Sequence, residues 1–81
     1  MFQAGDTVLH TKSATFYKIV AMAENAENGK EGEKIVVYRN FQGKVFTRPY
    51  DEFVEIVKVN NTETLPRFKK VNFVKKSVDD K

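Results

Sequence analysis

Residues 35–53, IVVYRNFQGKVFTRPYDEF, decide the predicted fold of this chain. Ile35 to Tyr38 is a continuous apolar run, which is typical of a strand inside a sheet. Gln42-Gly43 provides a tight turn, and Lys44 to Arg48 returns the chain as a second strand. Pro49 lacks a backbone N–H and restrains the residue before it, so that strand must end there. The stretch therefore predicts a β-hairpin followed by a break.

Weaker signals of the same kind lie on both sides of this hairpin. The sequence predicts further strands at Thr7–His10, Phe16–Ala23 and Val54–Val59, a solvated loop at Glu24–Glu33, and one helical turn at Tyr50–Phe53. An extended closing segment begins at Leu65–Phe68, and Val71, Phe73 and Val78 are candidates for an added edge strand. These elements predict a mainly β fold: a small, partly open SH3-like barrel of about five strands with one short helical turn.

The length of the chain allows one small domain. With 81 residues, of which 41% are hydrophobic and 12% aromatic, it can bury one core in which aromatic side chains do much of the packing. We expect a domain over residues 1–74 and a basic, polar tail over 75–81. Because cysteine is absent and neither a signal peptide nor a membrane-spanning run is visible, we expect a soluble cytoplasmic protein.

Positive charge is concentrated near the carboxyl end. The formal net charge is +3, and the excess comes chiefly from Arg67, Lys69, Lys70, Lys75 and Lys76. Such a segment usually forms a solvated face, or a strand whose lysines protect an exposed edge from aggregation. The alternative is a nucleic-acid-binding surface in which these cations alternate with aromatic residues.

The residue types give no support for catalysis. The chain has one histidine, His10, and none of the usual metal-ligand, nucleophile or phosphate-loop motifs. The adjacent carboxylates Asp51 and Glu52 fit the positive end of a helical turn better than an acid–base pair, because adjacent residues on one turn diverge. We therefore expect no enzyme activity, no metal and no cofactor.

Arginine and aromatic side chains of the hairpin are the better candidates for a binding site. Arg39 and Arg48 have the planar, bidentate geometry that suits a phosphate or carboxylate. In the competing interpretation Arg48 forms a salt bridge with Glu52 or Glu55 and so fixes the position of the helical turn. Stacking of a base could come from Tyr17, Tyr38, Phe41, Phe46 and Tyr50, although most aromatic residues of so small a domain belong to the core.

Several short motifs resemble a family of small bacterial and phage proteins that is grouped as a domain of unknown function. The motifs are His10-Thr11-Lys12, Ala23 to Glu27, Val36-Val37-Tyr38-Arg39, Phe46-Thr47-Arg48-Pro49 continuing to Phe53, and Pro66-Arg67-Phe68. The chain departs from the family pattern at Ser13, Asn25 and Phe46, where glycine, histidine and tryptophan are usual. The resemblance spans about three quarters of the chain and implies an SH3-like β-barrel, without an established activity.

The sequence thus favours a non-enzymatic domain that binds a small anionic, nucleotide-like ligand, as a phage protein that sequesters a host defence signal would. We expect Tyr38, Arg39 and Arg48 to point outward from the hairpin, and the site to be completed from other segments. The predicted ligand-binding residues are His10, Lys12, Tyr17, Glu27, Tyr38, Arg39, Phe46, Arg48 and Arg67. The alternatives are a nucleic-acid-binding module that uses Lys69, Lys70, Lys75 and Lys76, and a protein–protein adaptor, including a homo-oligomer formed through an open strand.

Overall fold

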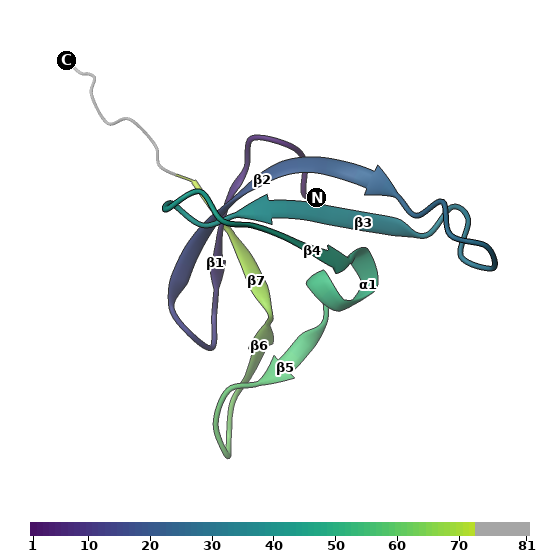
Figure 1. Ribbon diagram of the computed structural model, residues 1–81. Coiled ribbons are helices and arrows are strands. Elements are labelled where there is room, and N and C mark those ends of the chain that lie inside the picture. The colour runs from purple at the N-terminus through teal and green to yellow at the C-terminus, as the bar shows by residue number, and fades with distance from the viewer. Residues whose placement is uncertain (73–81) are drawn as a thin grey trace.

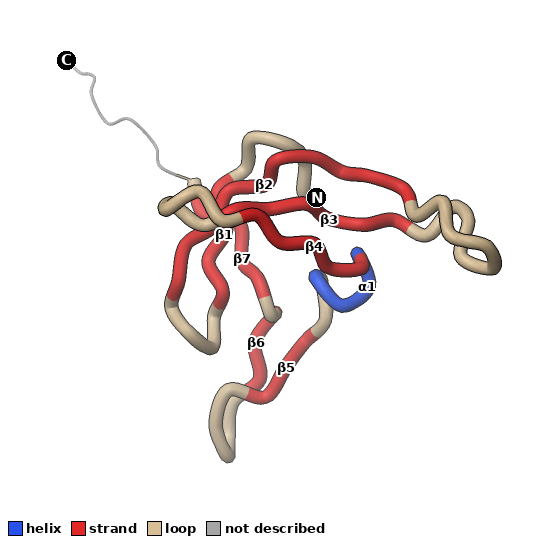
Figure 2. The backbone as a smooth tube through the Cα atoms, viewed as in Figure 1, coloured by secondary structure: helices blue, strands red, loops and turns tan. Residues whose placement is uncertain are grey.

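The computed structural model describes residues 1–72, and these form seven short strands and one helical turn (Figures 1 and 2). In chain order the elements are β1 (Thr7–His10), β2 (Thr15–Glu24), β3 (Lys34–Arg39), β4 (Val45–Pro49), α1 (Tyr50–Phe53), β5 (Ile56–Lys58), β6 (Thr64–Pro66) and β7 (Phe68–Val71).

Five of the strands form one antiparallel sheet in the order β4-β3-β2-β1-β7. The first part of β2 pairs with β1 and the second part pairs with β3, and the register shifts between Ile19 and Ala21. A bulge of this kind bends a strand and increases its twist. In Figure 1 the sheet accordingly turns from β2, β3 and β4 down into β1 and β7, while its two edge strands remain unpaired with each other.

The concave side of this bent sheet holds the core. Val8, Ile19, Val36, Tyr38 and Phe68 of the sheet are at most 5% exposed. Cross-strand neighbours in an antiparallel pair share a face, and Ile19 lies opposite Tyr38. All of these side chains therefore belong to one inner face.

The helical turn α1 closes this core from the side. Pro49 ends β4 with the extended backbone of φ −55° and ψ 141°, and the helix begins at the next residue, as the sequence predicts. Phe53 at the end of the turn is fully buried and stacks on Phe68 with ring centroids 4.0 Å apart. The turn before β4 contains Gly43 at φ +94°, where a residue with a Cβ atom would be strained.

The carboxyl half differs from the prediction in one respect. The expected strand Val54–Val59 is reduced to β5, which pairs with β6 in a separate two-stranded sheet rather than joining the main one. Ile56 is 59% exposed and only Val57 of β5 is partly buried, so this strand contributes little to the core. Figure 2 shows this small hairpin projecting beyond the main sheet.

The predicted fold class is confirmed: the domain is mainly β, its five-stranded antiparallel sheet is not closed, and it carries one short helical turn. In residues 1–72 no helix has the length and apolar character needed to span a bilayer. The expected domain boundary at residue 74 and the edge-strand residues Phe73 and Val78 lie outside the described residues.

Candidate binding site

Two strands and one strand junction bring basic side chains to the inner face. His10 at the end of β1 lies opposite Phe68 of β7, and Arg48 of β4 lies opposite Val36 of β3. Val36 and Phe68 are core residues of the inner face, so His10 and Arg48 face the same side of the sheet. Arg67 lies at the junction between β6 and β7.

Backbone contacts connect the loop after β1 to this junction. The Thr11 N–H donates to the Arg67 carbonyl at 3.0 Å, and the Thr11 hydroxyl donates to the Pro66 carbonyl at 2.7 Å. These bonds join two segments that are far apart in the sequence, and they place Lys12, the next residue, close to Arg67. We call His10, Lys12, Arg48 and Arg67 the cationic face.

A cluster of aromatic rings lies beneath the cationic face. His10 contacts Phe68 edge-on with centroids 5.0 Å apart, and Tyr17 meets both Phe68 and Tyr38 in the same T-shaped manner. Phe46 stacks on Tyr38 at 5.6 Å. The Arg48 guanidinium lies 5.9 Å from the centroid of Phe68, within the range of a cation–π contact. The rings thus form a continuous apolar floor under the charged groups.

Both arginines of the cationic face are held by carboxylates of the segment around α1. Arg67 donates from Nη2 to Glu55 Oε1 at 2.9 Å and from Nε to the Glu52 carbonyl at 3.0 Å. Arg48 donates from Nε to the Tyr38 hydroxyl at 3.3 Å and forms a longer ion pair with Glu52 at 3.5 Å. The predicted pairing of Arg48 with Glu52 is confirmed, whereas Glu55 belongs to Arg67.

The pKa of His10 is lowered by its surroundings. Burial lowers the pKa of its imidazole, and the nearby charges of Arg48, Arg67 and Lys12 lower it further. The Ser13 backbone N–H points to Nδ1 at 3.3 Å, so Nδ1 is the acceptor and the proton of the neutral ring lies on Nε2. The ring is therefore neutral near pH 7, with Nε2–H as its remaining donor.

The structure brings together His10, Lys12, Tyr17, Tyr38, Phe46, Arg48 and Arg67 of the predicted ligand-binding set. Tyr38 is only 5% exposed, so the expectation that it points outward is wrong; its hydroxyl serves Arg48 instead. Two other predicted residues lie elsewhere. Glu27 belongs to the loop between β2 and β3, which Figure 1 shows at the far end of that hairpin. Arg39 lies over Phe41 at 5.4 Å, at the opposite end of β3 from that loop.

The alternative basic set is divided between two surfaces. Lys69 and Lys70 are adjacent residues of β7, so their side chains point to opposite faces of the sheet. Lys70 also pairs with Asp6 at 3.5 Å and donates to the Met1 carbonyl at 3.4 Å. Lys75 and Lys76 lie outside the described residues.

Sequence reasoning missed two parts of the inner face. It did not assign Glu55 to Arg67, because the contact joins the connection before β5 to the β6–β7 junction, and no local pattern encodes their approach. It also missed that Met1, Phe2, Met22 and Lys34 line a hollow of the inner face together with Tyr50, which was predicted only as a residue for stacking. The strand bulge before Met22 was the one available signal, since the apolar spacing from Phe16 to Met22 departs from strict alternation.

The comparisons with known proteins identify a family but no function. The family model described as "Protein of unknown function (DUF1653)" matches residues 7–70 of the 81. The chain belongs to this family. The matched region begins with the first residue of β1 and ends within β7, so the family segment contains every residue of the cationic face. Neither a curated protein nor a solved structure matches the chain.

Proposed function

We propose that the cationic face binds a small anionic ligand of nucleotide type and holds it without converting it. The observation that carries this proposal is the convergence of His10, Lys12, Arg48 and Arg67 from separate segments onto one aromatic floor. Folding places the positive charges of Lys12, Arg48 and Arg67 around the neutral His10 ring, which costs electrostatic free energy, and an anion bound between them would recover it.

The cationic face retains hydrogen-bond donors for such a ligand. Glu52 and Glu55 neutralise the two arginines in part. Each carboxylate bonds to only one terminal nitrogen, Nη1 of Arg48 or Nη2 of Arg67. Among residues 1–72 the other terminal nitrogen of each arginine has no hydrogen-bond partner, and Lys12 forms no ion pair. A phosphate at this position would accept hydrogen bonds from both guanidinium groups and from the Lys12 ammonium.

The rings limit where a base could stack. Phe68 and Tyr38 are buried, so only the partly exposed Tyr17 and Phe46 can offer surface to a ligand. Phe46 already stacks on Tyr38 with one face, and the Lys44 ammonium lies 5.6 Å from its centroid. A base on Phe46 would therefore displace Lys44 or stack beside it, while its phosphate reaches toward Arg48.

The contacts of His10 favour binding over chemistry. Its Nδ1 lies 2.7 Å from the Ser13 hydroxyl, which at first resembles a nucleophile and its base. The Ser13 hydroxyl, however, also donates to Thr15 Oγ1 at 3.1 Å, so it bonds across the short connection from β1 to the first residue of β2. Within the described chain no carboxylate orients the ring, and no three His, Asp or Glu side chains are grouped to hold a metal.

A nucleotide panel tests the proposal. We expect mono-, di- and cyclic dinucleotides, but not the corresponding nucleosides, to raise the melting temperature and to shift the NMR signals of His10. Lys12→Gln should weaken that binding without loss of stability, because Lys12 is exposed and has no ion pair among the described residues. Lys30→Gln in the distant hairpin loop is the matched control and should leave affinity unchanged.

Two results would reject the proposal. One is the absence of any stabilisation across the panel at millimolar ligand; the other is equal binding by the wild type, Lys12→Gln and a folded Arg48→Ala variant. Recovery of the nucleotide after incubation, measured by mass spectrometry, tests the sequestering role expected of a phage protein. Unchanged nucleotide is the expected outcome, and turnover would contradict a purely binding role.

Nucleic-acid binding through Lys69 and Lys70 is the weaker candidate. Their opposite orientations on β7 and the pairing of Lys70 with Asp6 provide no continuous basic stripe in the described chain. Binding to mixed oligonucleotides that falls steeply with salt, and that is lost on replacing these two lysines, would reverse this order of preference.

A further inference from the structure

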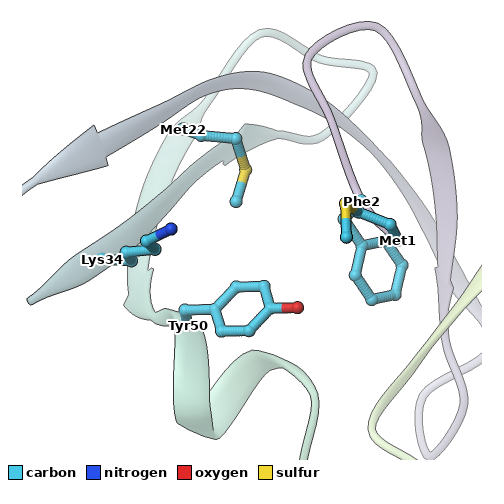
Figure 3. Close-up of a pocket in the computed structure, with 5 residues that line it drawn as sticks. All are labelled: Met1, Phe2, Met22, Lys34 and Tyr50. Carbon is cyan, nitrogen blue, oxygen red and sulfur yellow. The ribbon is translucent and has the colours of Figure 1, made fainter.

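A hollow lies on the inner face beside the cationic face. It has a volume of about 260 Å³ and is lined by Met1, Phe2, Met22, Lys34 and Tyr50 (Figure 3). None of these five residues belongs to the cationic face. The hollow borders that face at Arg48, because Val36 lies opposite both Met22 and Arg48, but the Arg48 guanidinium donates to the Tyr38 hydroxyl further along β3.

The bulge in β2 is what creates the apolar wall of this hollow. After the register shift Met22 lies opposite Val36, a core residue, and so it faces inward like Ile19 three residues before it. Met22 is nevertheless 38% exposed, because the hollow leaves part of it uncovered. Phe2 is fixed on the other side by its T-shaped contact with Phe53 at 5.2 Å.

Two polar groups border this apolar wall without a partner among the described residues. The Lys34 ammonium takes part in none of the ion pairs formed by residues 1–72, and the Tyr50 hydroxyl has no hydrogen bond there. Figure 3 shows the Lys34 nitrogen on the side of the hollow and the Tyr50 ring beneath it. The cross-strand neighbour of Lys34 is Glu24, which lowers but does not remove the positive potential at the ammonium.

The size of the hollow restricts the ligand. A cavity of roughly 150 Å³ holds benzene, and pockets for drug-sized ligands begin at roughly 300 Å³. A volume of about 260 Å³ therefore suits one ring or a branched hydrocarbon with a short polar group.

We propose that this hollow binds a small monocarboxylate with an aromatic or branched aliphatic body. The carboxylate accepts from the Lys34 ammonium and the Tyr50 hydroxyl, and the body rests between Phe2 and Met22. Such a ligand matches the hollow at both ends: its carboxylate makes a charged hydrogen bond, and its hydrocarbon body makes an apolar contact.

An NMR titration of the full chain with phenylacetate tests this site. We expect saturable shifts at the backbone amides of Met22, Lys34 and Tyr50. Phenylacetamide, which lacks the charge, and acetate, which lacks the ring, should each bind at least about tenfold more weakly, as expected for loss of the charged contact or of the apolar one. Lys34→Gln should weaken phenylacetate binding by about tenfold.

Lys58→Gln is the matched control, because Lys58 is an exposed lysine of β5 in the other sheet. It should leave the affinity for phenylacetate unchanged. Non-saturating shifts, equal binding of phenylacetate and phenylacetamide, or equal weakening by Lys34→Gln and Lys58→Gln would each overturn the proposal. Shifts centred on Arg48 and Arg67 would do the same, since they would assign the carboxylate to the cationic face.

Discussion

Replacement of Arg67 by methionine is the most informative perturbation of the cationic face. Arg67 connects the β6–β7 junction to the end of α1 through the Glu52 carbonyl and to the start of β5 through Glu55. Methionine keeps most of the apolar stem and removes both polar contacts. The variant therefore measures how much of the role of Arg67 is structural.

The structure gives the expected magnitude. A hydrogen bond from a charged donor contributes about 1.5–3 kcal/mol, and the lower part of that range applies because the Arg67 side chain is 24% exposed. The ion pair adds only about 0.2–1 kcal/mol, since the Glu55 side chain is 52% exposed. Arg67→Met should thus lower the free energy of unfolding by about 2–2.5 kcal/mol. At about 4–8 °C per kcal/mol, the melting temperature should fall by about 8–20 °C.

Urea unfolding followed by far-UV circular dichroism checks this value. Glu55→Gln removes the ion pair alone and should cost less than about 1 kcal/mol. Arg48→Met should cost less than Arg67→Met, because the hydrogen bond and the ion pair of Arg48 are longer, at 3.3 and 3.5 Å. A loss below about 0.5 kcal/mol in Arg67→Met, or a larger loss in Arg48→Met, would refute the reasoning.

Two further predictions concern the core and the imidazole. Phe53→Ala removes a fully buried ring that stacks on Phe68, so it should lower the free energy of unfolding by about 3–5 kcal/mol and abolish most of the cooperative thermal transition. Substitution of the exposed Asp51 in the same helical turn is the control. A wild-type melting curve for Phe53→Ala would contradict the assigned core. Burial and the neighbouring cations lower the pKa of His10, so the unfolded chain takes up its proton first and stability should fall as the pH drops below about 6.5. His10→Gln should remove this part of the pH dependence between pH 7.5 and 5.5 in equilibrium unfolding, and identical slopes in the two proteins would disprove the assignment.

Features that depend on a few neighbouring residues were predictable from the sequence. The apolar run of β3, the glycine turn before β4 and the proline that starts α1 each follow from local backbone preferences. In the predicted loop Glu24–Glu33, Gly29 adopts a positive φ of +84°, which glycine allows at little steric cost. The pairing of Arg48 with Glu52 was also within reach, because only four residues separate them.

Features that depend on distant pairing were not predictable. The segment Val54–Val59 has strand composition, yet its pairing with β6 rather than the main sheet depends on how the chain returns after residue 60. Tyr38 was expected to point outward, but its place opposite both Ile19 and Phe46 buries it. Glu27 and Arg39 carry suitable chemistry, although the hairpin and the β3–β4 turn hold them away from the cationic face.

The sequence by itself thus determined the mainly β class, the β3–β4 hairpin and the helical turn of this protein, because these follow from backbone preferences within a few residues. Only the tertiary structure decided which basic and aromatic side chains meet. His10 lies beside Phe68 and Arg67 because β1 pairs with β7, and the hollow lined by Met22 exists because a bulge in β2 turns this residue inward. Such contacts result from burying one shared core and from the register of the whole sheet, which no short stretch of the chain encodes.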